Sequence, residues 1–585
     1  MASRTASFRQ LVAVTASAVM ALGLASCAST DQEGGEASQV ASTSVAETDN
    51  SPYREARAEN VARAVAESFP QEPTVISDAG YTGVDTSEMF FDSSDTVVVS
   101  GAGIAQELRA ASIGVVAHSP VLHAPGGSDA EVIAEIERLG ASTVLLVGQA
   151  LPGFTEDSVE SVSKIIQDNG TEQGLAELTA LQFDEQTVAD VSDLARATAT
   201  LVADQQTMLV PAWEQTTTLD DETPDNSPTD TLDAFPLQTN RDGEMAPVVI
   251  ASPESGISAV ATARAYGAEV RFMDYPDPRL NSETMEMVAG LSERPLLALG
   301  DQFGTGELLA EKIERGETVT TELPGGGGLV FPGRRMVALY GHPSGPALGA
   351  MGEQPAAEAV ARVTELAKEY QPFDDEPVIP AFEVIATVAS EFPGDDGNFS
   401  NEFPVEDLVE YVDAITDAGG YAVLDLQPGR ANFLEQAKLY EELLKRPNVG
   451  LALDPEWKIG PDEQPMTRVG SVEASEVNEV AQWLADLVAE HELPQKAFVL
   501  HQFQVQMIRD RSQIDTTHPE LAFVLHADGH GAPGDKYATW DMLRQDLSDD
   551  YFMAWKNFYD EDFPTFTPQQ TYEDVNPRPW FVSYQ

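Results

Sequence analysis

LAFVLHADGHG, at residues 521–531, is one of eight short apolar segments that decide the fold of residues 336–585. The segments are rich in Val, Leu and Phe, and stretches with helical spacing lie between them. Such segments are typical of strands buried on both faces of a parallel sheet, with the amphipathic stretches as crossover helices. Eight of them predict an α/β fold, a (β/α)8 TIM-type barrel that lacks its last helix. The other seven are MVALYGHP from Met336, VIPAFEVIATV from Val378, YAVLDLQPG from Tyr421, VGLALDPEW from Val449, KAFVLHQF from Lys496, YFMAWKNF from Tyr551 and PWFVSYQ from Pro579.

Polar residues gather at the ends of these segments. In such barrels the chemistry takes place at the C-terminal ends of the strands. Because strand side chains alternate between two faces, residues two apart share a face, and three polar pairs could converge on one mouth. The pairs are Asp425 with Gln427, Asp454 with Glu456, and His526 with Asp528. The residues predicted to bind substrate at this mouth are Glu383, Asp425, Gln427, Arg430, Trp457, His501, Gln502, Asp528, Trp555, Lys556 and Tyr584.

The carboxylates of the mouth favour glycoside hydrolysis. That reaction needs a protonated acid near the leaving oxygen and a second group that stabilises the oxocarbenium-like centre or activates water. Asp454 and Glu456 resemble the terminal DxE of chitinase-like glycosidases, although the longer DxxDxDxE motif is absent. The resemblance implies that Glu456 is the acid and that Asp454 supports a substrate acetamido nucleophile. We therefore predict a carbohydrate-active barrel with Glu456 and Asp454 as its catalytic residues.

Other functions of the mouth stay open at this point. The HxDxH spacing of His526, Asp528 and His530 could ligate a divalent metal through N and O donors, or it could be a hydrogen-bonded polar rim. We assign no metal and no cofactor. Metal-dependent amidohydrolase barrels carry HxH on the first strand and Asp on the eighth, which this chain lacks. The alternative to an enzyme is a non-catalytic protein that binds the cell wall.

The chain is strongly acidic. Its 585 residues contain 97 Asp and Glu against 33 Lys and Arg, which gives a net charge of −64 and a pI near 4.1. Nucleic acid is an unexpected partner, because proteins bind a phosphate backbone through clustered Lys and Arg. The charge is typical of a solvated surface. The length has room for several domains.

The N-terminus predicts a membrane-anchored protein. Two arginines precede an apolar run at residues 11–24, which is too short for a bilayer span and typical of a secretory signal. Leu24 to Cys27 resemble the lipobox of bacterial lipoproteins, so residues 1–27 are predicted to be a signal peptide with lipidation of Cys27. Residues 28–52 are small, polar and acidic, and read as a disordered tether. The lipid would hold the protein on the extracellular face of the cell membrane.

Two smaller α/β units are predicted between the tether and the barrel. We expect helical spacing from Tyr53, strands at 95–100, 113–117 and 142–147, and a helix over 185–206. The second unit has expected strands at 247–251, 269–274 and 295–300. The predicted boundaries are 53–215 for the first unit, 216–245 for an acidic linker, 246–330 for the second unit and 331–585 for the barrel.

Parts of the chain resemble known bacterial envelope proteins. The segments VVVSGAG, SIGVVAHSPVLHAPGG and EVIAEIERLGASTVLLVGQ resemble the cell wall-binding repeat type 2, apart from Gln149 in place of a glycine. With LDLQPGR, LALDPEW and KNFYDED, the chain as a whole resembles actinobacterial lipoproteins that join such a region to a C-terminal barrel. The resemblance implies cell-wall polysaccharide or peptidoglycan as the partner, and the cell membrane as the location. It implies no reaction.

Overall fold

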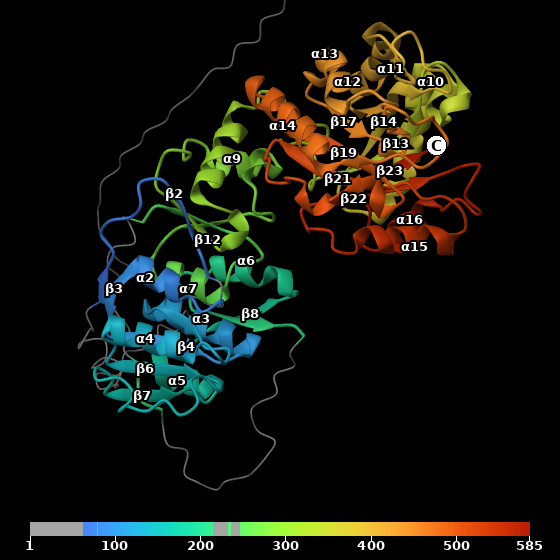
Figure 1. Ribbon diagram of the computed structural model, residues 1–585. Coiled ribbons are helices and arrows are strands. Elements are labelled where there is room, and N and C mark those ends of the chain that lie inside the picture. Colours follow the sequence, from blue (N-terminus) through green and yellow to red (C-terminus); the bar gives the residue numbers. More distant parts are fainter. Residues whose placement is uncertain (1–62, 79, 214–231, 236–245) are drawn as a thin grey trace, which may run out of the picture. The chain divides into compact units, whose positions relative to one another are not determined.

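The structure is a computed structural model that describes residues 63–78, 80–213, 232–235 and 246–585 (Figure 1). The predicted signal peptide, Cys27, the tether and most of the acidic linker lie outside these residues. The C-terminal part is a closed barrel of eight parallel strands, which confirms the predicted barrel. In chain order the strands are β13 (Arg335–Gly341), β14 (Val378–Ala389), β16 (Tyr421–Leu426), β17 (Val449–Leu453), β19 (Lys496–Gln502), β21 (Leu521–Ala527), β22 (Phe552–Asn557) and β23 (Phe581–Tyr584).

Each barrel strand pairs with its neighbours in the chain, and β13 closes the barrel by pairing with both β14 and β23. A short strand, β15 (Ser400–Glu402), adds antiparallel to the end of β14. Most crossovers are helical, whereas β19 connects to β21 through two 3-10 turns at Val505–Met507 and Arg511–Gln513. The barrel helices are α10 (Ala356–Tyr370), α11 (Val405–Asp417), α12 (Phe433–Leu439), α13 (Glu441–Leu444), α14 (Ala474–Glu490), α15 (Pro533–Arg544) and α16 (Pro568–Glu573).

The barrel strands bury both of their faces, as the nearly continuous apolar segments predict. On β13, Val337 and Leu339 belong to the core between the strands and the helices. The alternate residues Met336 and Ala338 belong to a second, apolar core inside the barrel. The period of two therefore separates an outer from an inner set of side chains on each strand.

The first N-terminal sheet has four parallel strands in the order β5-β4-β6-β7. They are β4 (Thr96–Ser100), β5 (Val121–His123), β6 (Thr143–Val147) and β7 (Lys164–Gln167), with helices α3 (Ile104–Ala117), α4 (Asp129–Leu139) and α5 (Glu172–Thr179). The prediction of a strand at 113–117 is wrong, because these residues form the second half of α3. Residues 110–117 are all buried, so this half of the helix has no polar face and its sequence resembles that of a buried strand.

The second N-terminal sheet has the order β11-β10-β12-β2, again parallel. Its strand β2 comes from before the first sheet in the chain, so the two units interleave in sequence. The elements are β2 (Pro73–Ile76), β10 (Val248–Ala251), β11 (Val270–Phe272), β12 (Leu296–Leu299), α7 (Ile257–Tyr266), α8 (Ser282–Val288) and α9 (Gly306–Thr318). The predicted strands at 247–251, 269–274 and 295–300 are therefore present, as β10, β11 and β12.

The predictions of two other helices are wrong where the structure describes their residues. Arg63–Val65 form strand β1, antiparallel to β3 (Phe91–Ser94), which follows helix α2 (Val84–Phe90). Within 185–206 the chain forms β8 (Asp184–Val188) and only a short helix, α6 (Leu194–Ala199). The Asp190 side chain accepts a hydrogen bond from the Ser192 amide and caps a 3-10 turn there, so helical structure begins only after β8, which pairs with β9 (Thr207–Pro211).

Candidate active site in the barrel mouth

Each of the eight barrel strands places one polar side chain in a layer inside the barrel, near its C-terminal end on seven strands and in the middle of the long strand β14. We call this set the upper layer: Tyr340, Glu383, Asp425, Asp454, His501, His526, Lys556 and Ser583. Each of them lies two residues after a member of the apolar inner core, which we call the lower layer. Because the strand period is two, the polar residue points to the same side as that apolar residue. All eight side chains are buried.

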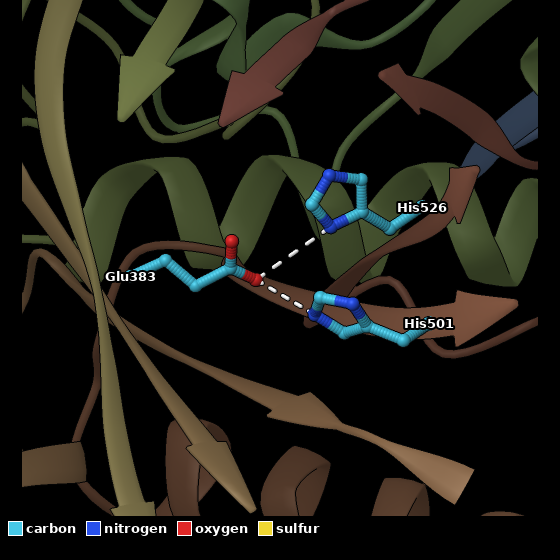
Figure 2. A group of neighbouring side chains, drawn as sticks. All are labelled: Glu383, His501 and His526. Atoms are coloured by element: carbon cyan, nitrogen blue, oxygen red, sulfur yellow. Dashed lines mark hydrogen bonds and ion pairs between the residues drawn. The ribbon is translucent and has the colours of Figure 1, made fainter. Parts of the chain in front are cut away.

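His501 is the centre of the upper layer. Its Nε2 lies 2.8 Å from Glu383 Oε1 and its Nδ1 lies 3.0 Å from Asp528 Oδ2, so the ring joins two carboxylates. The ring of His526 lies beside it, with centroids 4.5 Å apart, and its Nδ1 is 3.6 Å from the same Glu383 oxygen. That separation is too long for a hydrogen bond. Figure 2 shows both rings turning one nitrogen toward the Glu383 carboxylate.

Lys556 and Tyr340 continue the network on the other side of Asp528. Lys556 Nζ lies 3.2 Å from Asp528 Oδ1 and 3.7 Å from the centroid of the Tyr340 ring, a cation–π contact. The Tyr340 hydroxyl donates a hydrogen bond to Asp425 Oδ2 at 2.7 Å and accepts one from Gln427 Nε2 at 3.1 Å. The side chains of Asp425 and Gln427 therefore point to the same side, as their spacing predicts.

The buried groups divide into two electrostatic sets. Burial opposes the charge of Glu383, but His501 and His526 hold the pKa of that carboxyl well below its usual range. Burial likewise opposes the charge of Asp528, whose pKa is lowered by Lys556 and His501. The pKa of His501 is raised well above its usual value by its carboxylate partners, against the effect of burial. These groups form a charged set of mutual ion pairs.

The second set consists of carboxyls whose protonated form is favoured. Burial raises the pKa of Asp425 to about 6, and it raises the pKa of Asp454 well above its ordinary value, with Asp425 adding to the effect. Burial also raises the pKa of Glu456 to about 7, with a further contribution from Asp528. Lys556 and His501 oppose that rise. Glu456 can therefore carry a proton near neutral pH.

Glu456 is the carboxyl that reaches a pocket. Asp454 follows β17 and caps the 3-10 turn Pro455–Trp457, with its Oδ1 accepting a hydrogen bond from the Glu456 amide at 3.1 Å. Glu456 and Trp457 are half-buried and line a hollow of about 260 Å³. The hollow is completed by residues of the loops after β14, β16 and β17, among them Phe399, Gly429 and Met466. An acid and an indole ring thus share one concave surface.

Arg430 joins the loops beside this pocket. Its guanidinium donates to the Glu463 carbonyl at 2.7 Å and lies 4.5 Å from the centroid of the Phe399 ring. Phe399 and Gly429 line the pocket, so Arg430 holds two of its walls together. These contacts indicate that Arg430 maintains the shape of the pocket.

Three residues predicted to bind substrate face away from the upper layer. Gln502 follows His501 on β19 and points to the other side, where it contacts the Val505 carbonyl and accepts a hydrogen bond from Arg511. Trp555 is buried against the ring of Trp540. The Tyr584 hydroxyl lies 2.5 Å from that of Tyr370 in the outer core, and Tyr584 also lines a separate hollow of about 470 Å³ with Arg362 and Tyr559.

Tyr340 and Ser583 are members of the mouth that are absent from the predicted site. Tyr340 joins Lys556 to Asp425, and the Ser583 hydroxyl lies 3.2 Å from His526 Nε2. Both stand two residues after an apolar inner residue, a signal that the strand period contains. His530, the last residue of the HxDxH spacing, is exposed and packs its ring on Phe558. Among the described residues, the donor atoms that gather closely enough for a metal are those of Glu383, His501 and His526.

No protein-family model, curated protein or solved structure matches this chain. Barrels of this kind carry out many unrelated reactions, so the function has to be argued from the mouth itself. Across the part of the chain that the structure describes, every helix is too short or too polar to cross a membrane.

Proposed function

We propose that the barrel is a glycoside hydrolase that acts on cell-wall glycan, with Glu456 as its general acid. One observation carries the proposal: Glu456 lines a pocket, and burial raises its pKa to about 7. A general acid must be protonated at the working pH and must reach the leaving oxygen. Of the carboxyls in the mouth, Glu456 combines both properties, since Asp425, Asp454 and Glu383 are buried.

Asp454 would assist the same reaction by holding Glu456 in position. Its Oδ1 accepts the Glu456 amide hydrogen and so fixes the turn that carries the acid. In the proposed reaction Glu456 gives its proton to the glycosidic oxygen while the bond from that oxygen to the anomeric carbon breaks. The acetamido oxygen of an N-acetyl sugar then bonds to the anomeric carbon. Water later attacks that carbon, the bond to the acetamido oxygen breaks, and Glu456 removes the proton of the water, while Asp454 holds the turn that carries Glu456. Such a route needs no second nucleophilic carboxylate on the protein.

Trp457 supports the choice of a sugar. It adjoins Glu456 and lines the same pocket, so its indole face is available to stack on a sugar ring. Trp555 has no such role here, because its side chain is buried among other aromatic rings.

The proposal includes the location of the protein in the cell. A lipid on Cys27 would anchor the chain at the extracellular face of the cell membrane, and the N-terminal α/β units would bind wall polymer. This part rests on the sequence pattern of residues 1–27 and on the likeness to the cell wall-binding repeat.

A non-catalytic wall-binding barrel is the second candidate. The observation that favours it is the degree of pairing in the upper layer, where His501 and Tyr340 each bridge two partners and are buried. Paired buried networks can serve to specify one core structure rather than to react.

The test compares hydrolysis of peptidoglycan fragments and wall polysaccharide by the full chain and by its Glu456→Gln variant. Loss of the acid should lower the rate by about 10²- to 10⁴-fold. The rate of the unsubstituted chain should fall as the pH rises above about 7, because Glu456 then loses its proton. Glu473→Gln is the matched control: its side chain is exposed, and it should leave the rate unchanged.

Each outcome decides between the two candidates. Product from the unsubstituted chain and from Glu473→Gln, with little from Glu456→Gln, supports hydrolysis and assigns the acid. Equal turnover by all three chains would remove Glu456 from the mechanism. No product from any chain, together with retention on the wall material, would favour the binding protein.

A further inference from the structure

Three donor atoms from three strands face one another inside the upper layer. They are one carboxylate oxygen of Glu383 on β14, Nε2 of His501 on β19 and Nδ1 of His526 on β21 (Figure 2). All three atoms lie within 4.8 Å of one another, and all three residues are buried. Two imidazoles and a carboxylate are a common ligand set for divalent transition metals.

In each imidazole, the nitrogen that points away from Glu383 already has a polar partner. His501 Nδ1 lies 3.0 Å from Asp528 Oδ2, and His526 Nε2 lies 3.2 Å from the Ser583 hydroxyl. In metal sites a ligating histidine almost always bonds through its other nitrogen to a carboxylate, carbonyl or similar group, which orients the ring and sets its tautomer. Both rings therefore show the arrangement of ligands with their supporting partners.

The near side of the group contains buried polar atoms without hydrogen-bond partners. His526 Nδ1 and Glu383 Oε2 both lack one, although their residues have no exposed surface. Unpaired buried polar atoms are uncommon in folded proteins and call for an explanation, such as an ion. Here both atoms belong to the same group of three residues (Figure 2).

We propose that Glu383, His501 and His526 bind one divalent transition-metal ion of the Zn²⁺ class. Ligand atoms lie roughly 2.1 Å from such an ion. At that distance the 2.8 Å and 3.6 Å separations of the two nitrogens from Glu383 Oε1 correspond to ligand angles of about 84° and about 118°. These angles fall in the range that four- to six-coordinate sites use. The proposal is independent of the glycosidase proposal, because the ion would bind whether or not Glu456 is an acid.

The hard cations Ca²⁺ and Mg²⁺ fit this group poorly. They prefer sites made of oxygen, whereas two of the three donors here are imidazole nitrogens. The many surface carboxylates of this acidic chain offer oxygen donors in plenty. Excess Mg²⁺ would therefore occupy the surface and leave the Glu383, His501 and His526 group to the transition metal.

The test measures Zn²⁺ binding by the full chain without a polyhistidine tag, after chelator treatment and in excess Mg²⁺. Bound metal is quantified by mass spectrometry, and affinity by competition with a chelator. One equivalent should bind to the unsubstituted chain, and the affinity should fall by at least about 100-fold in Glu383→Gln and in His526→Gln. Ser583→Ala should weaken binding by about 10- to 100-fold, as the loss of a supporting partner does. His530→Gln, in the exposed loop beyond β21, is the matched control and should bind like the unsubstituted chain.

X-ray absorption of the zinc-loaded, unsubstituted chain keeps the proposal testable even if a buried variant fails to fold. Two imidazole ligands at the bound ion would support the site. The proposal is overturned if no ion is retained, if the absorption spectrum shows oxygen ligands alone, or if the folded Glu383→Gln and His526→Gln variants bind as tightly as His530→Gln. Hydrolysis assays do not enter this test, so a failure here leaves the proposed reaction untouched.

Discussion

The two layers inside the barrel are built on the same strands and on the same face, yet they have opposite chemistry. The lower layer is apolar, with members such as Met336, Ile379 and Val499. The upper layer, only two residues further along each strand, holds carboxyls, imidazoles, an amine and two hydroxyls. Both layers are buried, so exposure to water does not explain the difference. The position along the strand does, because the upper layer borders the loops that form the mouth.

The two layers tolerate substitution to different degrees. In the lower layer each side chain contributes volume and apolar contact, which a similar side chain can replace. In the upper layer a side chain such as Lys556 balances the charge of another that cannot reach water. Removing one member there leaves its partner buried and unpaired, and the loss exceeds that of a missing methyl group.

The largest effect should follow from Lys556→Met, which removes the charge and keeps most of the length of the side chain. Asp528 would then lose the ammonium that lies 3.2 Å from its Oδ1. We expect the free energy of unfolding to fall by about 3–5 kcal/mol, the usual effect of breaking a buried ion pair. Denaturant unfolding followed by tryptophan emission measures it, because five of the six tryptophans lie in the barrel domain.

A second substitution sharpens this result. In the double variant with Asp528→Asn the carboxylate that has lost its lysine partner is gone as well, so the loss should be smaller than the sum of the two single losses. Additive losses would show that Lys556 and Asp528 do not act as a pair. A Lys556→Met variant as stable as the unsubstituted chain would show that the charges of the upper layer are dispensable.

A smaller effect is expected in the pH dependence of stability, which the upper layer causes and the apolar lower layer does not. Burial raises the pKa of Asp425 from 3.8 to about 6, with Glu383 adding to it and with His501, Tyr340 and Lys556 opposing it. An acid whose pKa is raised on folding contributes stability that is complete below about pH 4 and is lost as the pH rises through about 6. Over this range the unsubstituted chain should lose about 1–3 kcal/mol more stability than Asp425→Asn, which cannot titrate.

The comparison of the two chains isolates the buried group. Surface carboxylates titrate equally in both, and Glu383 and Asp528 stay charged in this range because their pKa values are lowered. The measurement is a series of denaturation curves between pH 4 and pH 7 for each chain. Parallel pH profiles would place the titration outside the upper layer.

The sequence predicted all eight barrel strands, because their apolar segments are nearly continuous and alternate with stretches of helical spacing. It failed in α3, where the second half of the helix is buried on all sides and has the composition of a strand. In the mouth, the predicted site includes both His501 and Gln502, although neighbours on a strand face opposite ways. The run Ala497, Val499 and His501 points inward, which excludes Gln502 from the upper layer.

The meeting of Glu383 with His501 had no signal in the sequence. Glu383 lies on the second strand of the barrel and His501 on the fifth, so their contact depends on the closure of the barrel. The same holds for Ser583 and His526, on the eighth and sixth strands. Strand period predicts which residues point inward, whereas closure and tilt decide which of them touch.

The smallest effect is expected in the lower layer, from Ile379→Val on β14. Ile379 pairs in register with Met336 of β13 and belongs to the same apolar core. Deleting one methylene group there should lower the free energy of unfolding by about 0.5–1.5 kcal/mol. Hydrolysis of wall glycan, if the barrel performs it, should not change, because the side chain does not border the pocket. A loss as large as that of Lys556→Met would mean that the lower layer is packed with as little tolerance as the charged network above it, and the contrast between the two layers would then be one of chemistry and not of sensitivity to substitution.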